Sequence, residues 1–214
     1  GTSLHYALHP EGLAGLAQYI ELGSAQALAP APTPTPTTPK PTTPKPTAPV
    51  KTRTNPCQIL FVGTANTSRT IIAECILNRL GGHNFHARSA GVMPTGKVHG
   101  ATTALLEEHG YAVRHLASKS WKPFAAATAT KLDMVITIGA KPPKKTDMPW
   151  PGAPVLAHWA INNPIKPKTG TAKTTALLEQ VYDELEERIT ALLALPVLEL
   201  SDDALTQALA ELGA

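Results

Sequence analysis

A short segment of the chain combines residue types that can bind a tetrahedral anion. It runs from Gly63 to Thr70 and contains only small or polar residues apart from Arg69. The apolar residues 58–62 before it predict a buried strand, and the apolar-faced stretch after it predicts a helix to Leu80. A loop between a strand and a helix directs several backbone N–H groups to one point, where the helix dipole also favours negative charge. Arg69 adds a planar donor for two oxygens, so the segment predicts an oxyanion-binding loop.

The same loop contains no strong nucleophile. Its serine and threonine hydroxyls are weak nucleophiles unless a base activates them, and no His or Asp adjoins the loop in sequence. Cys57 lies about 20 Å away at the far end of the predicted strand, at ~3.3 Å per residue. Cys75 lies about 9 Å along the predicted helix, at ~1.5 Å per residue. We therefore expect both cysteines to be structural.

Predicted strands and helices alternate around the loop. Further strands are expected at 85–91, 111–113, 133–138 and 154–159, and further helices at 101–109, 174–195 and 202–212. The strand at 133–138 is almost continuously apolar, as a parallel sheet covered on both faces requires. The alternation predicts an α/β fold, a doubly wound and mainly four-stranded parallel sheet with helices on both faces. Such folds bind ligands at the carboxyl ends of their strands, where this loop lies.

The composition divides the chain into three parts. Residues 29–54 are rich in Pro and Thr and predict an extended linker, because proline lacks an N–H donor and fixes φ. Residues 1–28 are expected to be a fragment or leader, and residues 55–214 the folded domain. Four of the 19 Lys and Arg residues lie in the linker, so the charge of the remainder indicates no nucleic-acid surface.

Other features of the composition bear on location and ligands. The two cysteines are too few for a disulfide scaffold and favour a cytoplasmic protein. No apolar run reaches the ~20 residues of a membrane span, so no membrane contact is expected. No residue pattern suggests a metal site.

The loop resembles that of a known family. Residues 62–70, Val-Gly-Thr-Ala-Asn-Thr-Ser-Arg-Thr, resemble the active-site P-loop of the low-molecular-weight protein tyrosine phosphatases and the related arsenate reductases, Val-Cys-Thr-Gly-Asn-x-x-Arg-Ser. Gly63 stands where the family has its nucleophilic cysteine. The resemblance implies a site for arsenate, phosphate or sulfate, in which Asn66 shapes the loop, Arg69 clamps the anion and Thr70 would hydrogen-bond the missing thiolate. The anion-binding residues it implies are Thr64, Ala65, Asn66, Thr67, Ser68, Arg69 and Thr70.

Two further positions depart from the family pattern. The phosphatases use an aspartate before a proline as general acid, and Asn163 before Pro164 holds that place here. An amide cannot supply the proton, although Asn-Asn-Pro is also an ordinary turn sequence. Thiol-relay arsenate reductases carry a cysteine after the strand that ends here at Ile138, and this chain has Gly139. Whether the chain is an enzyme is therefore left open.

Other segments resemble the arsenate reductase branch, namely Ser89-Ala90-Gly91, Trp150-Pro151-Gly152 and the tail from Leu195. The parent activity implied is thiol-dependent reduction of arsenate to arsenite in arsenic resistance. It implies a thiol electron donor and a thiol-redox protein as partner, with no bound cofactor. The primary hypothesis is an oxyanion-binding domain that is catalytically inactive because of Gly63. The alternatives are a pseudoenzyme that senses anions or binds partners, fused to a transcriptional regulator, and residual protein tyrosine phosphatase activity.

The N-terminal residues carry a second resemblance. Residues 6–13, Tyr-Ala-Leu-His-Pro-Glu-Gly-Leu, resemble the last wing strand and the final helix of arsenic-responsive winged-helix repressors. This implies that residues 1–28 are the end of such a domain in a fusion protein. Nucleic acid would then be contacted only through that upstream domain.

Overall fold

The structure is a computed structural model that describes residues 55–141, 149–166, 170–197 and 199–213. The N-terminal segment 1–28 and the linker 29–54 predicted from the sequence lie outside the described residues. In the described part, the elements follow an alternating order that begins with strand β1 (Cys57–Gly63), helix α1 (Arg69–Leu80), strand β2 (Phe85–Gly91) and helix α2 (Gly100–Glu108). The 3₁₀-helix η3 (Lys122–Ala125), strands β3 (Met134–Gly139) and β4 (Val155–Ala160), and helices α3 (Thr171–Ala194) and α4 (Asp202–Glu211) complete it.

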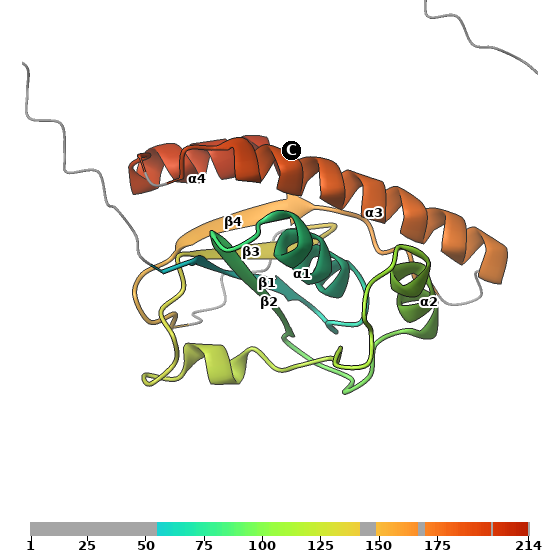
Figure 1. The fold of residues 1–214 in the computed structure, drawn as a ribbon. Helices are drawn as coiled ribbons and strands as arrows, with labels where there is room; N and C mark the ends of the chain where they lie inside the picture. Colours follow the sequence, from blue (N-terminus) through green and yellow to red (C-terminus); the bar gives the residue numbers. More distant parts are fainter. Residues whose placement is uncertain (1–54, 142–148, 167–169, 198, 214) are drawn as a thin grey trace, which may run out of the picture. The chain divides into compact units, whose positions relative to one another are not determined.

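The strands form one parallel sheet in the order β2-β1-β3-β4. β1 is therefore a central strand, and its register with β2 runs from Cys57 opposite Phe85 to Gly63 opposite Gly91. β1 and β3 are buried along most of their length, as their apolar sequences predict. The predicted four-stranded parallel sheet is confirmed. The loop after β1 lies at the carboxyl end of the sheet, beside the end of β2 (Figure 1).

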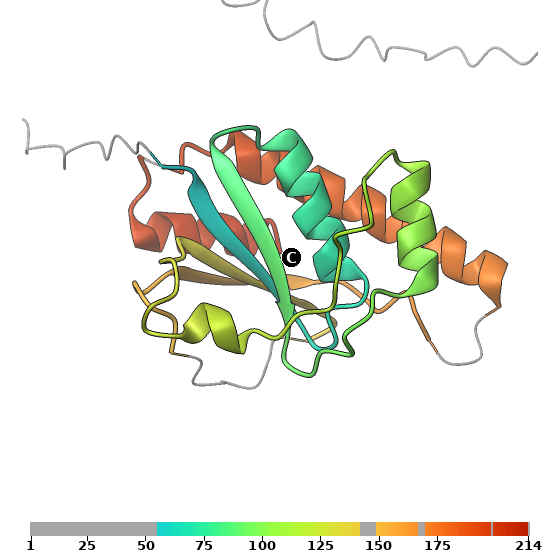
Figure 2. The same ribbon diagram turned by 60° about the horizontal axis from the view of Figure 1, so that its bottom comes forward.

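The two faces of the sheet are covered unequally. All four α-helices contribute to the larger core, on the face that includes Phe61, Ile136 and Trp159. Figure 2 shows these helices together on one side of the sheet and η3 on the other. The smaller core on the second face consists of five buried residues, with Trp121, Phe124 and Trp150 packed against them. The expectation of helices on both faces is met on this second face only by η3, among the described residues.

The short length of η3 follows from its sequence. Pro123 lies in its first turn, and the residues after Phe124 are alanines and threonines up to Thr130. Such residues bury too little apolar surface to anchor a longer amphipathic helix on the sheet. Large aromatic side chains from the loops cover that face instead.

One predicted strand is wrong. Residues 111–113 are irregular, because the Tyr111 N–H donates to Leu106 O at 2.8 Å and so closes the end of α2. Gly110, at a φ of +76°, permits this turn of the chain. The other predicted elements are present, with ends displaced by up to three residues. The largest displacement is at α3, which begins at Thr171 rather than at residue 174.

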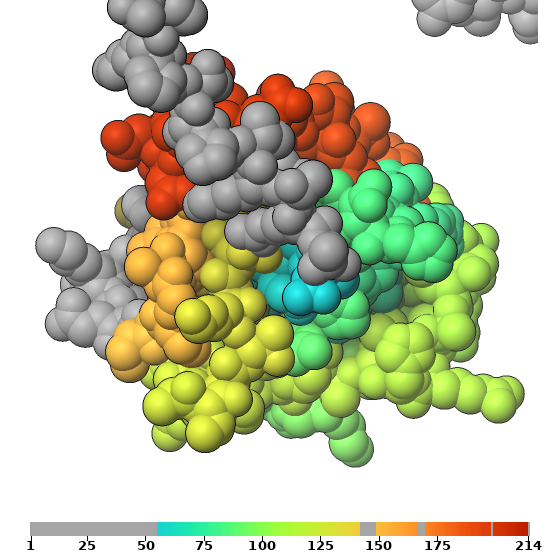
Figure 3. Space-filling model, turned by 60° about the vertical axis from the view of Figure 1, so that its left-hand side comes forward, coloured from blue at the N-terminus to red at the C-terminus, as the bar shows by residue number. Residues whose placement is uncertain are grey.

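The start of β1 marks the other end of the sheet. Figure 3 views the domain from the side on which this strand, in cyan, reaches the surface, with the C-terminal helices in red above it. Cys57 is buried at this end, and the oxyanion-binding loop predicted from the sequence follows the opposite end of the same strand. The strand thus separates that cysteine from the loop by its full length.

Candidate anion-binding site

A pocket of about 380 Å³ is formed by the loop after β1. Its lining contains every residue from Gly63 to Thr70, together with Ile138 at the end of β3 and Asn163 after β4. The structure therefore brings the predicted loop residues and the predicted general-acid position into one pocket. The carboxyl ends of three neighbouring strands meet there, as parallel packing requires.

The loop carbonyl groups point away from the pocket toward donors on other segments. Gly63 O accepts from the Val92 N–H at 3.0 Å, and Thr64 O accepts from the Met93 N–H at 2.8 Å. Further along, Thr67 O accepts from the His99 N–H at 3.0 Å and Ala65 O from the Ser118 hydroxyl at 2.7 Å. With their carbonyls held outside, the loop's N–H groups are left for the pocket. None of the backbone N–H groups from residues 64 to 68 donates to an acceptor in the described part of the chain.

This arrangement depends on Gly91. A Cβ atom at this position would lie 2.9 Å from Thr64 O and 3.0 Å from both the Ala65 carbonyl carbon and Asn66 Cβ. The loop therefore packs directly against the backbone at the end of β2. Only glycine allows an approach this close, which explains a glycine after Ser89 and Ala90 in physical terms.

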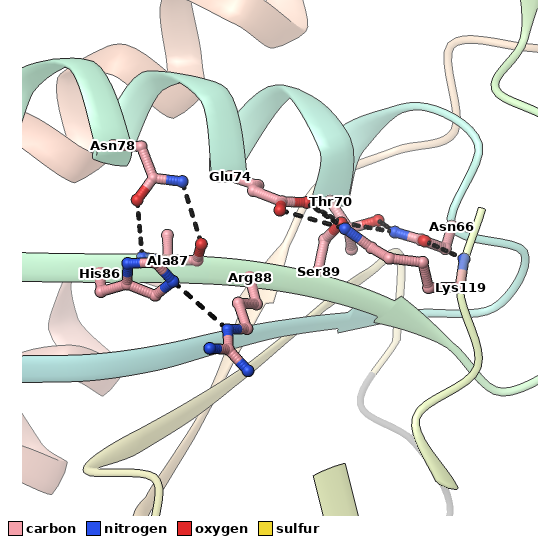
Figure 4. A network of polar contacts seen from close by, with 9 residues as sticks. All are labelled: Asn66, Thr70, Glu74, Asn78, His86, Ala87, Arg88, Ser89 and Lys119. Atoms are coloured by element: carbon pink, nitrogen blue, oxygen red, sulfur yellow. Dashed lines mark hydrogen bonds and ion pairs between the residues drawn. The ribbon is translucent and has the colours of Figure 1, made fainter. Parts of the chain in front are cut away.

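Asn66 is the residue that shapes the loop. It is 2% exposed and has a φ of +51°, in the left-handed region that asparagine tolerates better than most residues. Its Nδ2 donates to Thr70 Oγ1 at 2.9 Å and to Ser89 Oγ at 2.8 Å, and its Oδ1 accepts from the Lys119 N–H at 2.7 Å (Figure 4). These three contacts hold the strained backbone of the loop in place.

A charged pair lies behind Asn66, away from the pocket. The Ser89 hydroxyl donates to Glu74, and Lys119 Nζ lies 3.1 Å from both carboxylate oxygens of Glu74. Figure 4 shows these side chains in a row between α1, β2 and the segment before η3. On the same face of α1, the Asn78 amide bonds the backbone N–H and C=O of Ala87 at 2.8 and 2.9 Å. α1 is thus joined to β2 by polar contacts along its whole length.

Arg69 is the first residue of α1 and borders the pocket. Its Nη1 donates to Ile161 O at 2.6 Å, just after β4, so part of its guanidinium is already engaged. Burial lowers the pKa of Arg69 from its usual value of 12.5, although arginine remains charged in proteins. The positive charge is therefore held at the edge of the pocket.

Ser68 has an unfilled hydrogen-bonding group. It precedes α1 but makes no side-chain capping bond, and its Oγ is buried without a partner in the described part of the chain. Buried hydroxyls are normally hydrogen-bonded. Because Ser68 lines the pocket, a ligand there could supply the partner.

Gly63 leaves the nucleophile position without a side chain. A Cβ atom there would lie 3.0 Å from Thr70 Cγ2, 3.7 Å from Ile138 O and 3.8 Å from Thr70 Oγ1. A cysteine would fit after a shift of the Thr70 methyl group by a few tenths of an ångström. The pocket can therefore hold the missing residue, but the chain does not supply it.

The other two departures from the family pattern lie close by. Asn163 is exposed, and its side chain bonds the backbone of Ile165 through Nδ2 at 2.7 Å and Oδ1 at 3.3 Å. It stabilises a local turn and lines the pocket at once, so both interpretations made from the sequence describe it. A Cβ atom on Gly139 would lie 3.4 Å from Lys141 O and 3.9 Å from His158 Cε1.

Neither cysteine replaces the missing thiol. Cys57 is 4% exposed at the far end of β1. Cys75 is partly buried on α1 and does not line the pocket, and burial with the nearby Glu74 charge raises the pKa of its thiol to about 12. A thiol that holds its proton so strongly is a poor nucleophile near neutral pH.

Several residues of the site were not predicted from the sequence. Glu74, Lys119 and the Ile161 carbonyl contribute contacts that join segments far apart in the chain. Glu74 alone left a signal, since it follows Thr70 by four residues and so shares its helix face. Among the described residues, no group of three His, Cys, Asp or Glu side chains could hold a metal ion. No helix in the described part has the length and apolar character to span a bilayer.

Fold and pocket together define a class, α/β proteins that hold an oxyanion-type loop between the first strand and first helix of a parallel sheet. The model of the low molecular weight phosphotyrosine protein phosphatase family matches residues 58–205, more than half of the chain. The chain belongs to this family. A search of curated protein sequences gives no match.

Solved structures with the same fold include arsenate reductases and a phosphatase. An arsenate reductase in the phosphate binding state has 22% identity and a TM-score of 0.53, covering 64% of this chain and 97% of that one. The arsenate reductase from Archaeoglobus fulgidus has 26% identity and a TM-score of 0.48, covering 64% and 99%. The tyrosine phosphatase Wzb from Escherichia coli K30, in complex with sulphate, has 16% identity and a TM-score of 0.46, covering 61% and 94%.

Proposed function

We propose that the domain binds a tetrahedral oxyanion, arsenate or phosphate, on residues 63–70 and does not transform it. One observation carries the proposal: the loop carbonyls bond outward, so the loop N–H groups surround one pocket with Arg69 at its edge. Backbone N–H groups and a helix N-terminus bind such anions without further charges. Ser68 Oγ and Thr70 Oγ1 add hydroxyls to the same pocket.

Inactivity is proposed because the reacting groups are absent while the binding groups remain. The family's first step needs a thiolate at position 63, and glycine offers no atom that could attack. Asn163 cannot protonate a leaving group, and no cysteine follows β3 at Gly139. The arsenate reductase branch would make thiol-dependent arsenate reduction the parent activity, with a thiol-redox protein as electron donor. The phosphate binding state of the similar arsenate reductase is consistent with the proposed ligand.

Ligand-induced stabilisation tests anion binding. Phosphate, arsenate or sulfate should raise the melting temperature, and a ligand at 100 times its Kd adds ~2.7 kcal/mol to the free energy of unfolding. Arg69→Ala should abolish the rise, whereas Arg114→Ala, at an exposed arginine, should retain it. Because Arg69 also bonds Ile161 O, the comparison uses the ligand-induced rise and not the melting temperature itself. Equal rises in wild type and Arg69→Ala would place the anion elsewhere.

Enzyme assays test the proposed inactivity. The wild-type protein should hydrolyse no aryl phosphate and reduce no arsenate with added thiols. Gly63→Cys should hydrolyse aryl phosphate slowly, and adding Asn163→Asp should increase the rate by roughly 10² or more, the usual contribution of a general acid. Turnover by the wild type, including residual tyrosine phosphatase activity, would contradict the proposal.

An anion-sensing pseudoenzyme is the second candidate. The bond from Arg69 to Ile161 O joins the pocket to the segment after β4, so an anion drawn to Arg69 also acts on that segment. Phosphate should then slow amide hydrogen exchange in residues 161–166 in the wild type but not in Arg69→Ala. Slowing confined to residues 63–70 would favour simple binding.

A further inference from the structure

The hydrogen bonds beneath the anion loop have a fixed order of donors and acceptors (Figure 4). The order starts at Lys119, whose backbone N–H lies 2.7 Å from Asn66 Oδ1. A backbone N–H can only donate, so the Asn66 oxygen faces Lys119 and its NH₂ group faces the opposite way. The orientation of this buried amide is therefore set by the main chain.

The Asn66 NH₂ group makes two hydroxyl groups into acceptors. Its Nδ2 lies 2.9 Å from Thr70 Oγ1 and 2.8 Å from Ser89 Oγ. Because an amide NH₂ can only donate, each hydroxyl oxygen must accept and must place its own proton elsewhere.

The proton of Ser89 goes to Glu74. Ser89 Oγ donates to Glu74 Oε2, and Lys119 Nζ lies 3.1 Å from both oxygens of the same carboxylate. The Glu74 side chain is only 14% exposed. Since an ammonium group can only donate, both carboxylate oxygens serve as acceptors, and Ser89 has nowhere better to send its proton.

The proton of Thr70 has no such acceptor. No acceptor in the described part of the chain receives the Thr70 hydroxyl, and Thr70 lines the anion pocket. Its Oγ1 lies 3.8 Å from the place where a Cβ atom on residue 63 would stand. We propose that Glu74 and Lys119 are positioning residues that fix this hydrogen-bond order and thereby keep the Thr70 hydroxyl as a donor into the anion pocket. The proposal rests on the oxyanion site proposed above.

Substituting Glu74 by glutamine separates this role from the effect of charge. Removing a negative charge near the pocket would by itself strengthen anion binding. Glutamine, however, places an NH₂ group against either Lys119 or Ser89, and both are donors there. The resulting conflict reaches Asn66 and Thr70 through Ser89, so the hydrogen-bond order predicts weaker binding.

The double variant Glu74→Gln/Lys119→Met removes the conflict. Methionine offers no donor, so the introduced glutamine can turn its amide oxygen toward Ser89 and restore the order at unchanged net charge. If Glu74 and Lys119 acted only as an ion pair that holds α1 to the loop, the double variant would bind no better than the single one.

Phosphate affinity measured by calorimetry tests these expectations on the full chain. Glu74→Gln and Thr70→Val should each weaken binding roughly tenfold, the effect of one lost hydrogen bond to a charged ligand. Thr70→Ser and the double variant should bind within about threefold of wild type. Glu179→Gln, which removes a carboxylate bonded to His109, is the charge-matched control and should not weaken binding. Unchanged or tighter binding by Glu74→Gln, or a double variant as weak as the single, overturns the proposal.

A thiol introduced at position 63 gives a readout that needs no anion. In Gly63→Cys, the pKa of the thiol follows from the pH dependence of its alkylation rate. Adding Glu74→Gln should raise that pKa because the Thr70 donor is lost, whereas loss of a negative charge alone would lower it. Adding Lys119→Met as well should bring the pKa back. If wild type binds no phosphate, the proposed function fails, while the direction of this shift still decides the hydrogen-bond order.

Discussion

Two polar clusters flank α1 and act by different physical means. The loop cluster, consisting of Asn66, Thr70, Glu74, Ser89 and Lys119, is a chain of directed hydrogen bonds beneath the pocket. The helix cluster, consisting of Arg79, His109, Tyr111, Glu179 and Tyr182, joins the end of α2 to α3. In the helix cluster the main contacts are faces of planar groups: His109 stacks on Tyr182 at 3.8 Å, and the Arg79 guanidinium lies 3.2 Å from the Tyr111 ring centre.

The difference shows which cluster can serve a function. In the helix cluster the Tyr111 and Tyr182 hydroxyls lie 3.1 Å apart and either can donate, so no order is imposed. Its contribution is contact area and stacking, which stabilise the packing of α3. In the loop cluster each donor is fixed, and the order ends at a hydroxyl on the pocket. We therefore expect the two clusters to respond to substitution in opposite ways.

The largest effect should come from the helix cluster. Tyr182 is 3% exposed, and Tyr182→Ala should lower the free energy of unfolding by about 3 kcal/mol, as loss of a buried aromatic ring does. Urea unfolding measures this loss. The phosphate-induced rise in melting temperature should stay as in wild type, because the pocket is lined by other residues. Tyr182→Phe, which keeps the ring, should cost about 1 kcal/mol. Loss of the phosphate response in Tyr182→Ala would show that the two clusters are coupled.

A smaller loss of stability with complete loss of binding should follow from Gly91→Ala. The added methyl group meets backbone atoms of the loop at 2.9 to 3.0 Å, so the loop must move. Overpacking of this kind costs about 1–3 kcal/mol, and the displaced N–H groups should no longer converge on an anion. Urea unfolding and the phosphate response measure the two effects. Gly100→Ala is the matched control, since nothing lies within 4 Å of its added Cβ and α2 should be unchanged or slightly more stable.

The sequence predicted what depends on local pattern. β1, its loop and α1 were predicted because an apolar run, a small-residue segment and a helical stripe follow one another directly. The four parallel strands followed from the alternation of elements. The misplaced strand at 111–113 shows the limit of that pattern, since Tyr111 is apolar for its packing in the helix cluster and its N–H serves the end of α2.

The support of the site could not be predicted in the same way. Lys119 and Glu74 lie 45 residues apart, and only the fold brings them together. Arg69 was predicted as an anion clamp, but nothing in the sequence indicates that the Ile161 carbonyl shares it. Gly91 was predicted as the end of a strand, whereas the close approach of residues 64–66 is a property of the folded backbone. Pocket residues adjacent in sequence were therefore found, and those contributed from a distance were not.

The smallest expected effect distinguishes the clusters by pH. Burial, followed by the Tyr182 hydroxyl, raises the pKa of Tyr111 above its usual value of 10.0, and burial also raises that of Tyr182. Above pH 10 the unfolded chain loses these phenol protons while the folded chain keeps them, so stability should fall as pH rises through this window. The fall in melting temperature should be smaller in Tyr111→Phe than in wild type. Cys75 titrates in the same window and is present in both proteins, so it cancels from the difference. Thr70→Val in the loop cluster should leave the alkaline slope unchanged, and a change there as large as in Tyr111→Phe would contradict the separation of the two clusters.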